Sequence, residues 1–333
     1  MTYGKKRIEE VDILRGIAAA LMILGHSFIV YPIDVSNVSW CVALSHFVYT
    51  FHMELFFVLA GVVYHCSNYK EFYYKKFRRI MVPYLFFGTM ALLMRAFGGA
   101  AVNGVEPVGF GVYKLLFHGG GYWFLYVLFL IYAIYPWLDK FCPGIWIKLS
   151  LMAILLIIKE FAELPSFLAI RTVVSYLPYF LLGHCLAKLQ GGFPKKMAQV
   201  AVAGISVLLF AVLDWFEILG GRELGATMSF VRAIAIMVFL YILVRALMPL
   251  WHKSLPCKAL HLFLTDCGKY SLQLYLFNGY LLVIFRIFIC QVLNITEPVI
   301  IVLGIWIGNL AVTLVACKWI IPKIPLFRTL CGL

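Results

Sequence analysis

Charged residues are scarce in this chain. They make up 13% of its 333 positions, whereas hydrophobic residues make up 64%. A soluble domain carries about 25% charged residues, so this composition argues against a soluble protein. The chain also lacks a long polar linker and any low-complexity segment. We therefore expect a single membrane domain over residues 1–333, with no appended soluble domain.

Cysteine patterning gives no sign of a metal centre or a disulfide framework. The nine cysteines form no CxxC motif and no cluster with histidine at metal-ligand spacing. Most of them fall inside apolar runs, where cysteine behaves as a small hydrophobic residue. We therefore expect no bound metal and no permanently bound cofactor.

What the chain does contain is a series of apolar runs of about 20 residues, the length that crosses a bilayer as a helix. The runs are continuous rather than alternating, which favours helices over barrel strands. The sequence thus predicts an all-α polytopic membrane protein with about ten transmembrane helices. The expected spans are residues 10–31, 43–66, 79–98, 121–138, 145–162, 171–189, 196–216, 228–249, 270–291 and 297–320.

The formal net charge is +13, and the distribution of basic residues explains it without nucleic acid. Basic residues of polytopic proteins collect on cytoplasmic loops. With the N-terminus inside, the inner segments near 5–7, 70–79, 140–148, 188–196, 245–269 and 318–328 hold 20 of the 28 Lys and Arg residues. We therefore expect both termini in the cytoplasm, a location in the cell membrane, lipid contacts and no nucleic-acid partner.

The first expected helix carries ionisable residues at membrane depth. Arg15 and His26 are eleven residues apart, which places them on one helical face about 16 Å from each other along the axis. Asp12 shares that face and can pair with Arg15. Ionisable groups in a membrane usually face a protein interior or a wet cavity and mark functional sites. The alternatives are an ion pair that only closes the inner end of the helix, and a histidine that is only a satisfied polar residue.

Further candidates lie in the next spans. His52 and Glu54 stand at membrane depth in the second span, where they form either an acid–base pair or a structural hydrogen bond between helices. Tyr122 and Trp123 follow three glycines, and aromatic residues at a span edge are usually interface anchors. The basic segment 75–79 (KKFRR) lies at the cytoplasmic end of the third span. It suits either lipid headgroups or the phosphates of a cytosolic cofactor.

These residues resemble a known family, the acyltransferase-3 family of membrane-bound acyltransferases that mostly O-acetylate cell-surface glycans. The most specific match is the first helix, with Asp12, Arg15-Gly16 and His26. Ala60 stands where the family usually has serine, and Asn278 where relatives commonly have histidine. The other matching segments, in order, are residues 54–61 (ELFFVLAG), 76–79 (KFRR), 82–84 (VPY), 122–125 (YWFL), 179–183 (YFLLG) and 268–276 (GKYSLQLYL).

The resemblance implies an O-acetyltransferase of the bacterial plasma membrane. It would move an acyl group, acetyl above all, from cytosolic acetyl-CoA to a hydroxyl of an envelope polysaccharide or glycolipid precursor. In that scheme His26, Glu54 and Asp12 are the catalytic candidates. Arg15, Lys76, Arg78 and Arg79 bind the donor, and His52, Tyr122 and Trp123 line the acceptor cavity.

Two questions stay open at this point. A proton-coupled transporter or flippase of a glycan or lipid-linked intermediate is the alternative function, because intramembrane charges suit transport as well. The oligomeric state is also open, with a homodimer among the alternatives.

Overall fold

The protein is described by a computed structural model, which covers residues 8–97, 107–189, 196–221, 223–251 and 253–333. Within these ranges every regular element is a helix. The all-α fold expected from the continuous apolar runs is therefore confirmed. The basic residues of segment 5–7, used above to orient the chain, lie outside the described ranges.

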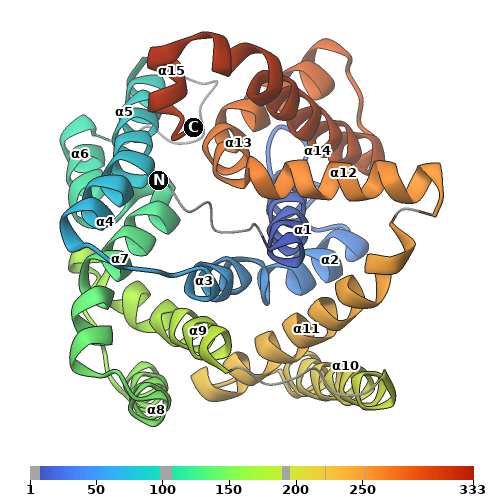
Figure 1. Cartoon of the computed structure of the whole chain (residues 1–333). Coiled ribbons are helices and arrows are strands. Elements are labelled where there is room, and N and C mark those ends of the chain that lie inside the picture. The colour runs from blue at the N-terminus through green and yellow to red at the C-terminus, as the bar shows by residue number, and fades with distance from the viewer. Residues whose placement is uncertain (1–7, 98–106, 190–195, 222, 252) are drawn as a thin grey trace.

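The N-terminal half begins with α1, which lies near the middle of the bundle in Figure 1. In several places neighbouring elements follow one another with only a short break. The elements of this half are α1 (Glu9–His26), α2 (Ser39–Tyr49), α3 (His52–Val62), α4 (Tyr69–Lys76), the π-helical η1 (Phe77–Met81), α5 (Val82–Phe97), α6 (Val108–Phe117), the 3-10 turn η3 (Gly120–Tyr122), α7 (Trp123–Phe141) and α8 (Ile145–Phe161).

The C-terminal half closes the ring of helices around α1 and α3 (Figure 1). Its elements are η4 (Phe167–Ala169), α9 (Ile170–Lys188), α10 (Lys196–Gly220), α11 (Ala226–Leu247), η5 (Met248–Leu250), α12 (Leu255–Lys269), α13 (Ser271–Ile287), η6 (Phe288–Val292), α14 (Pro298–Val315), η7 (Ala316–Ile320), η8 (Ile321–Lys323) and α15 (Pro325–Leu330).

Eight helical segments of the described chain are long and apolar enough to cross a membrane. The chain is therefore a multi-pass membrane protein, although the expected number of about ten is met only in part. The two other expected spans are also helical. However, α1 carries several charged residues near its start, and α8 has only 17 residues.

Some boundaries and four helices differ from the sequence-based expectation. The first span ends at His26 rather than at residue 31, and the second begins at Ser39 rather than at residue 43. Helices α4, α6, α12 and α15 lie outside the expected spans. Helix α12 mixes apolar residues with Lys258, His261 and Asp266, so no long apolar run indicates it.

Two pairs of glycines set the closest helix contacts in the bundle. A Cβ atom on Gly16 of α1 would collide with the carbonyl oxygen of Leu264 in α12, and one on Gly268 would collide with that of Asp12. The same reciprocal arrangement joins α3 and α9 through Gly61 and Gly183. Small residues let helix backbones approach closely inside a membrane. These contacts fix α1 against α12 and α3 against α9.

The functional candidates on α1 lie toward two opposite ends of the bundle. The backbone nitrogen of Ala226, at the start of α11, donates a hydrogen bond to Glu160 at the end of α8. A side-chain contact between His46 and Asp214 joins α2 to the end of α10. His26, at the end of α1 and against Tyr49 of α2, belongs to this same end. Asp12 and Arg15 lie in the opposite half of α1.

Candidate active site

The ion pair expected in the first helix is present. Arg15 Nη1 lies 3.9 Å from Asp12 Oδ1, one helical turn away. Asp12 is buried, whereas Arg15 is half-buried. The backbone of Asp12 also forms the close contact with Gly268, so the packing of α12 fixes the position of the residue that pairs with Arg15.

His26 is the last residue of α1 and is exposed, in contrast to most of the helix. Its Nδ1 lies 2.8 Å from the carbonyl oxygen of Met22. A carbonyl oxygen only accepts a hydrogen bond, so Nδ1 carries the proton and the neutral ring leaves an electron pair on Nε2. That nitrogen is the atom a general base or a nucleophile uses.

A second histidine lies near His26, with a tyrosine between them. The ring of Tyr49 is 6.3 Å from the ring of His26 and 5.2 Å from the ring of His52, measured between centroids. His52 is 2% exposed, and its Nδ1 lies 2.8 Å from the carbonyl oxygen of Val48. The structure thus brings together two histidines, His26 and His52, that the sequence suggested separately.

Tyr49 is a member of this group that sequence reasoning missed. It is the last residue of α2. The helix is interrupted at Thr50–Phe51, and α3 begins at His52. The break places Tyr49 and His52 on successive helices while keeping them in contact. An apolar run that continues through the break gives no sequence signal for it.

Glu54 does not join the histidines. It stands two residues after His52 in α3, which turns it about 200° around the helix axis. Its side chain instead lines a cavity with Lys159 of α8 and Tyr176 of α9. No contact of the described residues joins Glu54 to His26, so the three expected catalytic residues do not form one cluster.

The basic segment lies away from α1: α4 and α5, which flank it, are at the left of Figure 1, whereas α1 is near the middle. Lys76 Nζ lies 3.6 Å from the ring centroid of Tyr132, a cation–π contact that occupies this ammonium group. Arg78 and Arg79 are exposed on the π-helical η1, and Arg78 contacts Thr329 Oγ1 at 3.4 Å. Short π-helical segments such as η1 occur frequently at functional sites.

Tyr122 and Trp123 take different positions. Tyr122 is buried and donates a hydrogen bond of 3.0 Å to the carbonyl oxygen of Leu276, which gives it a role in joining helices. Trp123 is half-buried, and its ring lies 5.3 Å from that of Tyr176. Through Tyr176, Trp123 is therefore connected to the cavity of Glu54 and not to His26.

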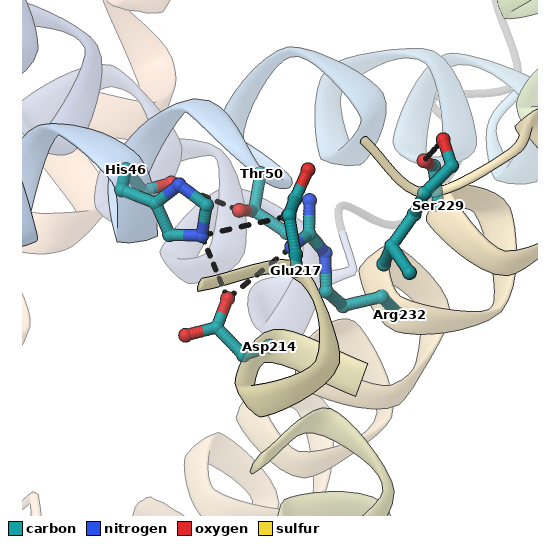
Figure 2. Close-up of polar contacts among 7 residues, drawn as sticks. His46, Thr50, Asp214, Glu217, Ser229 and Arg232 are labelled. Atoms are coloured by element: carbon teal, nitrogen blue, oxygen red, sulfur yellow. Dashed lines mark hydrogen bonds and ion pairs between the residues drawn. The ribbon is translucent and has the colours of Figure 1, made fainter. Parts of the chain in front are cut away.

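A polar network joins α2 to α10 and α11 (Figure 2). His46 Nε2 lies 2.8 Å from Asp214 Oδ1 and 3.7 Å from Glu217 Oε2. Arg232, which is buried, contacts both carboxylates. Because the guanidinium already neutralises one of these two charges, the group is an ion-pair network and a poor metal site. These residues were not among the sequence-based candidates, although charged residues inside apolar spans are a signal that could have indicated them.

Asn278 also has a partner. Asn309 Nδ2 donates to Asn278 Oδ1 at 2.9 Å, and Thr313 Oγ1 lies 3.4 Å from Asn309 Oδ1. All three side chains are buried between α13 and α14. They satisfy one another as hydrogen-bonded polar groups inside a membrane helix pair usually do.

These features define a class of protein: a multi-pass membrane protein with an accessible histidine and an ion pair on one central helix. Comparison with known families identifies the family within this class. The profile of the acyltransferase 3 family, described as an acyltransferase domain, matches residues 8–318. The chain belongs to this family and is a membrane acyltransferase. Neither a curated protein nor a solved structure matches it.

Proposed function

We propose that the protein is a membrane-bound O-acyltransferase that moves an acetyl group from cytosolic acetyl-CoA to a hydroxyl of an envelope glycan or glycolipid precursor. The observation that carries the proposal is the exposed His26, whose Nε2 is left free by the bond from Nδ1 to Met22. Membership of the acyltransferase 3 family supports acyl transfer as the reaction.

In the proposed reaction Nε2 of His26 removes the proton from an acceptor hydroxyl. The hydroxyl oxygen then attacks the thioester carbonyl, an ester bond forms, and the carbon–sulfur bond breaks. The imidazolium returns the proton to the leaving thiolate, so that the step produces the acetyl ester and free CoA. In a variant of this scheme, Nε2 itself carries the acetyl group between donor and acceptor.

The donor is proposed to enter from the cytoplasm. Arg15 lies in the half of α1 opposite His26, about 16 Å along the axis, a separation comparable with the reach of a pantetheine arm. Asp12 orients Arg15, as their contact of 3.9 Å indicates. The exposed Arg78 and Arg79 are available to the donor's phosphates, whereas Lys76 is held by Tyr132 and contributes less.

This direction of transfer requires the orientation inferred from the basic residues. We propose that α1 and α8 also cross the bilayer, which gives ten crossings with both termini in the cytoplasm of a bacterial cell. Acetyl-CoA is then a substrate and not a resident cofactor. The acceptor hydroxyl approaches His26 from the outer end.

The test uses the full chain in membranes supplied with acetyl-CoA labelled in its acetyl group. The enzyme yields alkali-labile label on saccharide together with free CoA, whereas a transporter yields no covalent product. His26→Ala is expected to abolish the label at normal protein level. Full acetylation by this variant would overturn the role given to His26, and absence of any ester from the unaltered chain would overturn acyl transfer.

A further inference from the structure

A polar cavity lies between α3, α8 and α9, apart from the histidine group. Its inner part has a volume of about 200 Å³ and is lined by Glu54, Lys159, Arg171, Ser175 and Tyr176, among others. A wider part of about 630 Å³ continues from it and shares Lys159, Arg171 and Ser175. Pockets of this size hold small ligands.

The floor of the cavity contains a carboxylate with an unused hydrogen-bonding atom. Glu54 Oε2 is buried and has no hydrogen-bond partner among the described residues. Lys159 and Arg232 act on Glu54 through space, yet neither bonds to it. A buried acceptor without a donor is costly, so the position suits a ligand that brings a hydroxyl or amide donor.

One wall of the cavity is aromatic. The ring of Tyr176 is stacked on that of Phe57, with 4.6 Å between centroids and 24° between planes, and lies 5.3 Å from the ring of Trp123. The packing between these two rings fixes Tyr176 in position. A fixed aromatic side chain beside convergent polar groups is typical of a preformed ligand site.

The cavity opens at the end of the bundle where His26 lies. Lys159 is near the end of α8, and Arg171 is near the start of α9. Glu160 accepts a hydrogen bond from the backbone nitrogen of Ala226, which ties this region to the start of α11. A ligand longer than one sugar unit, bound from this end, can therefore reach both faces of α3, with His52 on one and Glu54 on the other.

We propose that this cavity binds a saccharide unit of the acceptor, next to the unit that is acetylated. The proposal rests on the proposed function and names a second contact for the same acceptor. Glu54 accepts from sugar hydroxyls, while Lys159 and Arg171 donate to ring or hydroxyl oxygens. Because Glu160 and Glu163 also line the wider part, the charges are mixed and suit a neutral saccharide better than a strongly anionic one.

The test follows chemical modification of Glu54 rather than acetyl transfer. The full chain in detergent is treated with the hydrophobic reagent dicyclohexylcarbodiimide, and modification of Glu54 is followed by peptide mass spectrometry, with Glu54→Gln to assign the labelled peptide. The probes are N,N′-diacetylchitobiose, cellobiose and oligosaccharides released by mild acid from the envelope. Sorbitol, an open-chain polyol, is the control.

At least one of these saccharides is expected to slow the modification threefold or more, with no effect of sorbitol. Arg171→Gln should weaken this protection, whereas Lys258→Gln, an exposed change on α12, should not. If no saccharide protects Glu54 in protein that still transfers acetyl groups, the cavity is not an acceptor site and the proposed function stands. Protection in a chain that transfers no acetyl group would overturn the function and leave the site.

Discussion

His26 and His52 contact the ring of the same tyrosine, Tyr49, and each donates its Nδ1 proton to the carbonyl oxygen four residues before it. Both rings are therefore fixed in the same tautomer. They differ in access, since His26 is exposed and His52 is 2% exposed. Only His26 is thus available to a substrate, while His52 is placed to support Tyr49.

This difference predicts an unequal response to replacement of the two histidines. His26→Gln keeps a polar side chain but cannot take up a proton, so acetyl transfer should fall by about 10²- to 10⁴-fold. His52→Gln should reduce transfer by about tenfold or less, equivalent to about 1.4 kcal/mol. Initial rates of label transfer at equal protein level measure both effects. A larger loss for His52→Gln would contradict the assignment.

The glycine contact between α1 and α12 predicts a loss of stability on enlargement. In Gly16→Ala and Gly268→Ala the new methyl group meets backbone oxygen atoms, which cannot rotate away. We expect a destabilisation of about 1–3 kcal/mol from overpacking, seen as a lower midpoint of thermal unfolding in detergent. The matched control is Gly204→Ala in α10, where no atom lies within 4 Å. An unchanged midpoint for both α1–α12 variants would show that the helices do not approach closely.

The network of His46 and Arg232 predicts a strong effect of removing the guanidinium. Arg232→Met leaves Asp214 and Glu217 close together without their cation, which should cost about 3–5 kcal/mol of stability. The double variant Arg232→Met/Glu217→Gln removes one of the two negative charges that repel each other. It should therefore recover part of the lost stability. Unfolding midpoints of the two variants give the comparison. No recovery in the double variant would show that the carboxylates do not interact through Arg232.

Cysteine labelling tests the orientation. All nine cysteines are free, and burial raises the pKa of Cys267 and of Cys331 to about 12. These two thiols stay protonated at neutral pH and should resist a maleimide. The half-buried Cys142 and Cys257 should react from the cytoplasmic side only.

In intact cells a membrane-impermeant maleimide should therefore label neither Cys142 nor Cys257 until the membrane is opened. An Asn37→Cys variant supplies the opposite control, because Asn37 is exposed in the segment between α1 and α2. It should react in intact cells. Labelling of Cys257 without opening the membrane would reverse the proposed orientation.

The sequence predicted the helices of this fold well where apolar runs are long. Each expected span is largely helical, because an apolar run long enough to cross a bilayer forms a helix. The sequence did not indicate α12, since its polar residues interrupt the apolar pattern. It also did not indicate the break between α2 and α3, where hydrophobic residues continue through the change of direction.

For the site, the sequence predicted those residues that share one helix. The pairing of Asp12 with Arg15 follows from helical spacing and is confirmed by their contact. An acid–base pair of His52 and Glu54 was among the sequence-based expectations, whereas the two side chains have different neighbours in the structure. Tyr49 and Lys159 come from other helices, and periodicity within one helix carries no information about its neighbours.

The position of His26 as the final residue of α1 has an electrostatic effect on the reaction. The aligned peptide dipoles of α1 place a partial negative charge at this end of the helix, and the ring already bonds to one of the last carbonyl groups, that of Met22. When His26 accepts a proton, this field stabilises the imidazolium by about 0.3–1 kcal/mol, up to about 2 where the site is partly buried. The end of α1 at His26 therefore favours the protonated imidazole during proton transfer. The eleven residues between Arg15 and His26 set the distance between these two side chains.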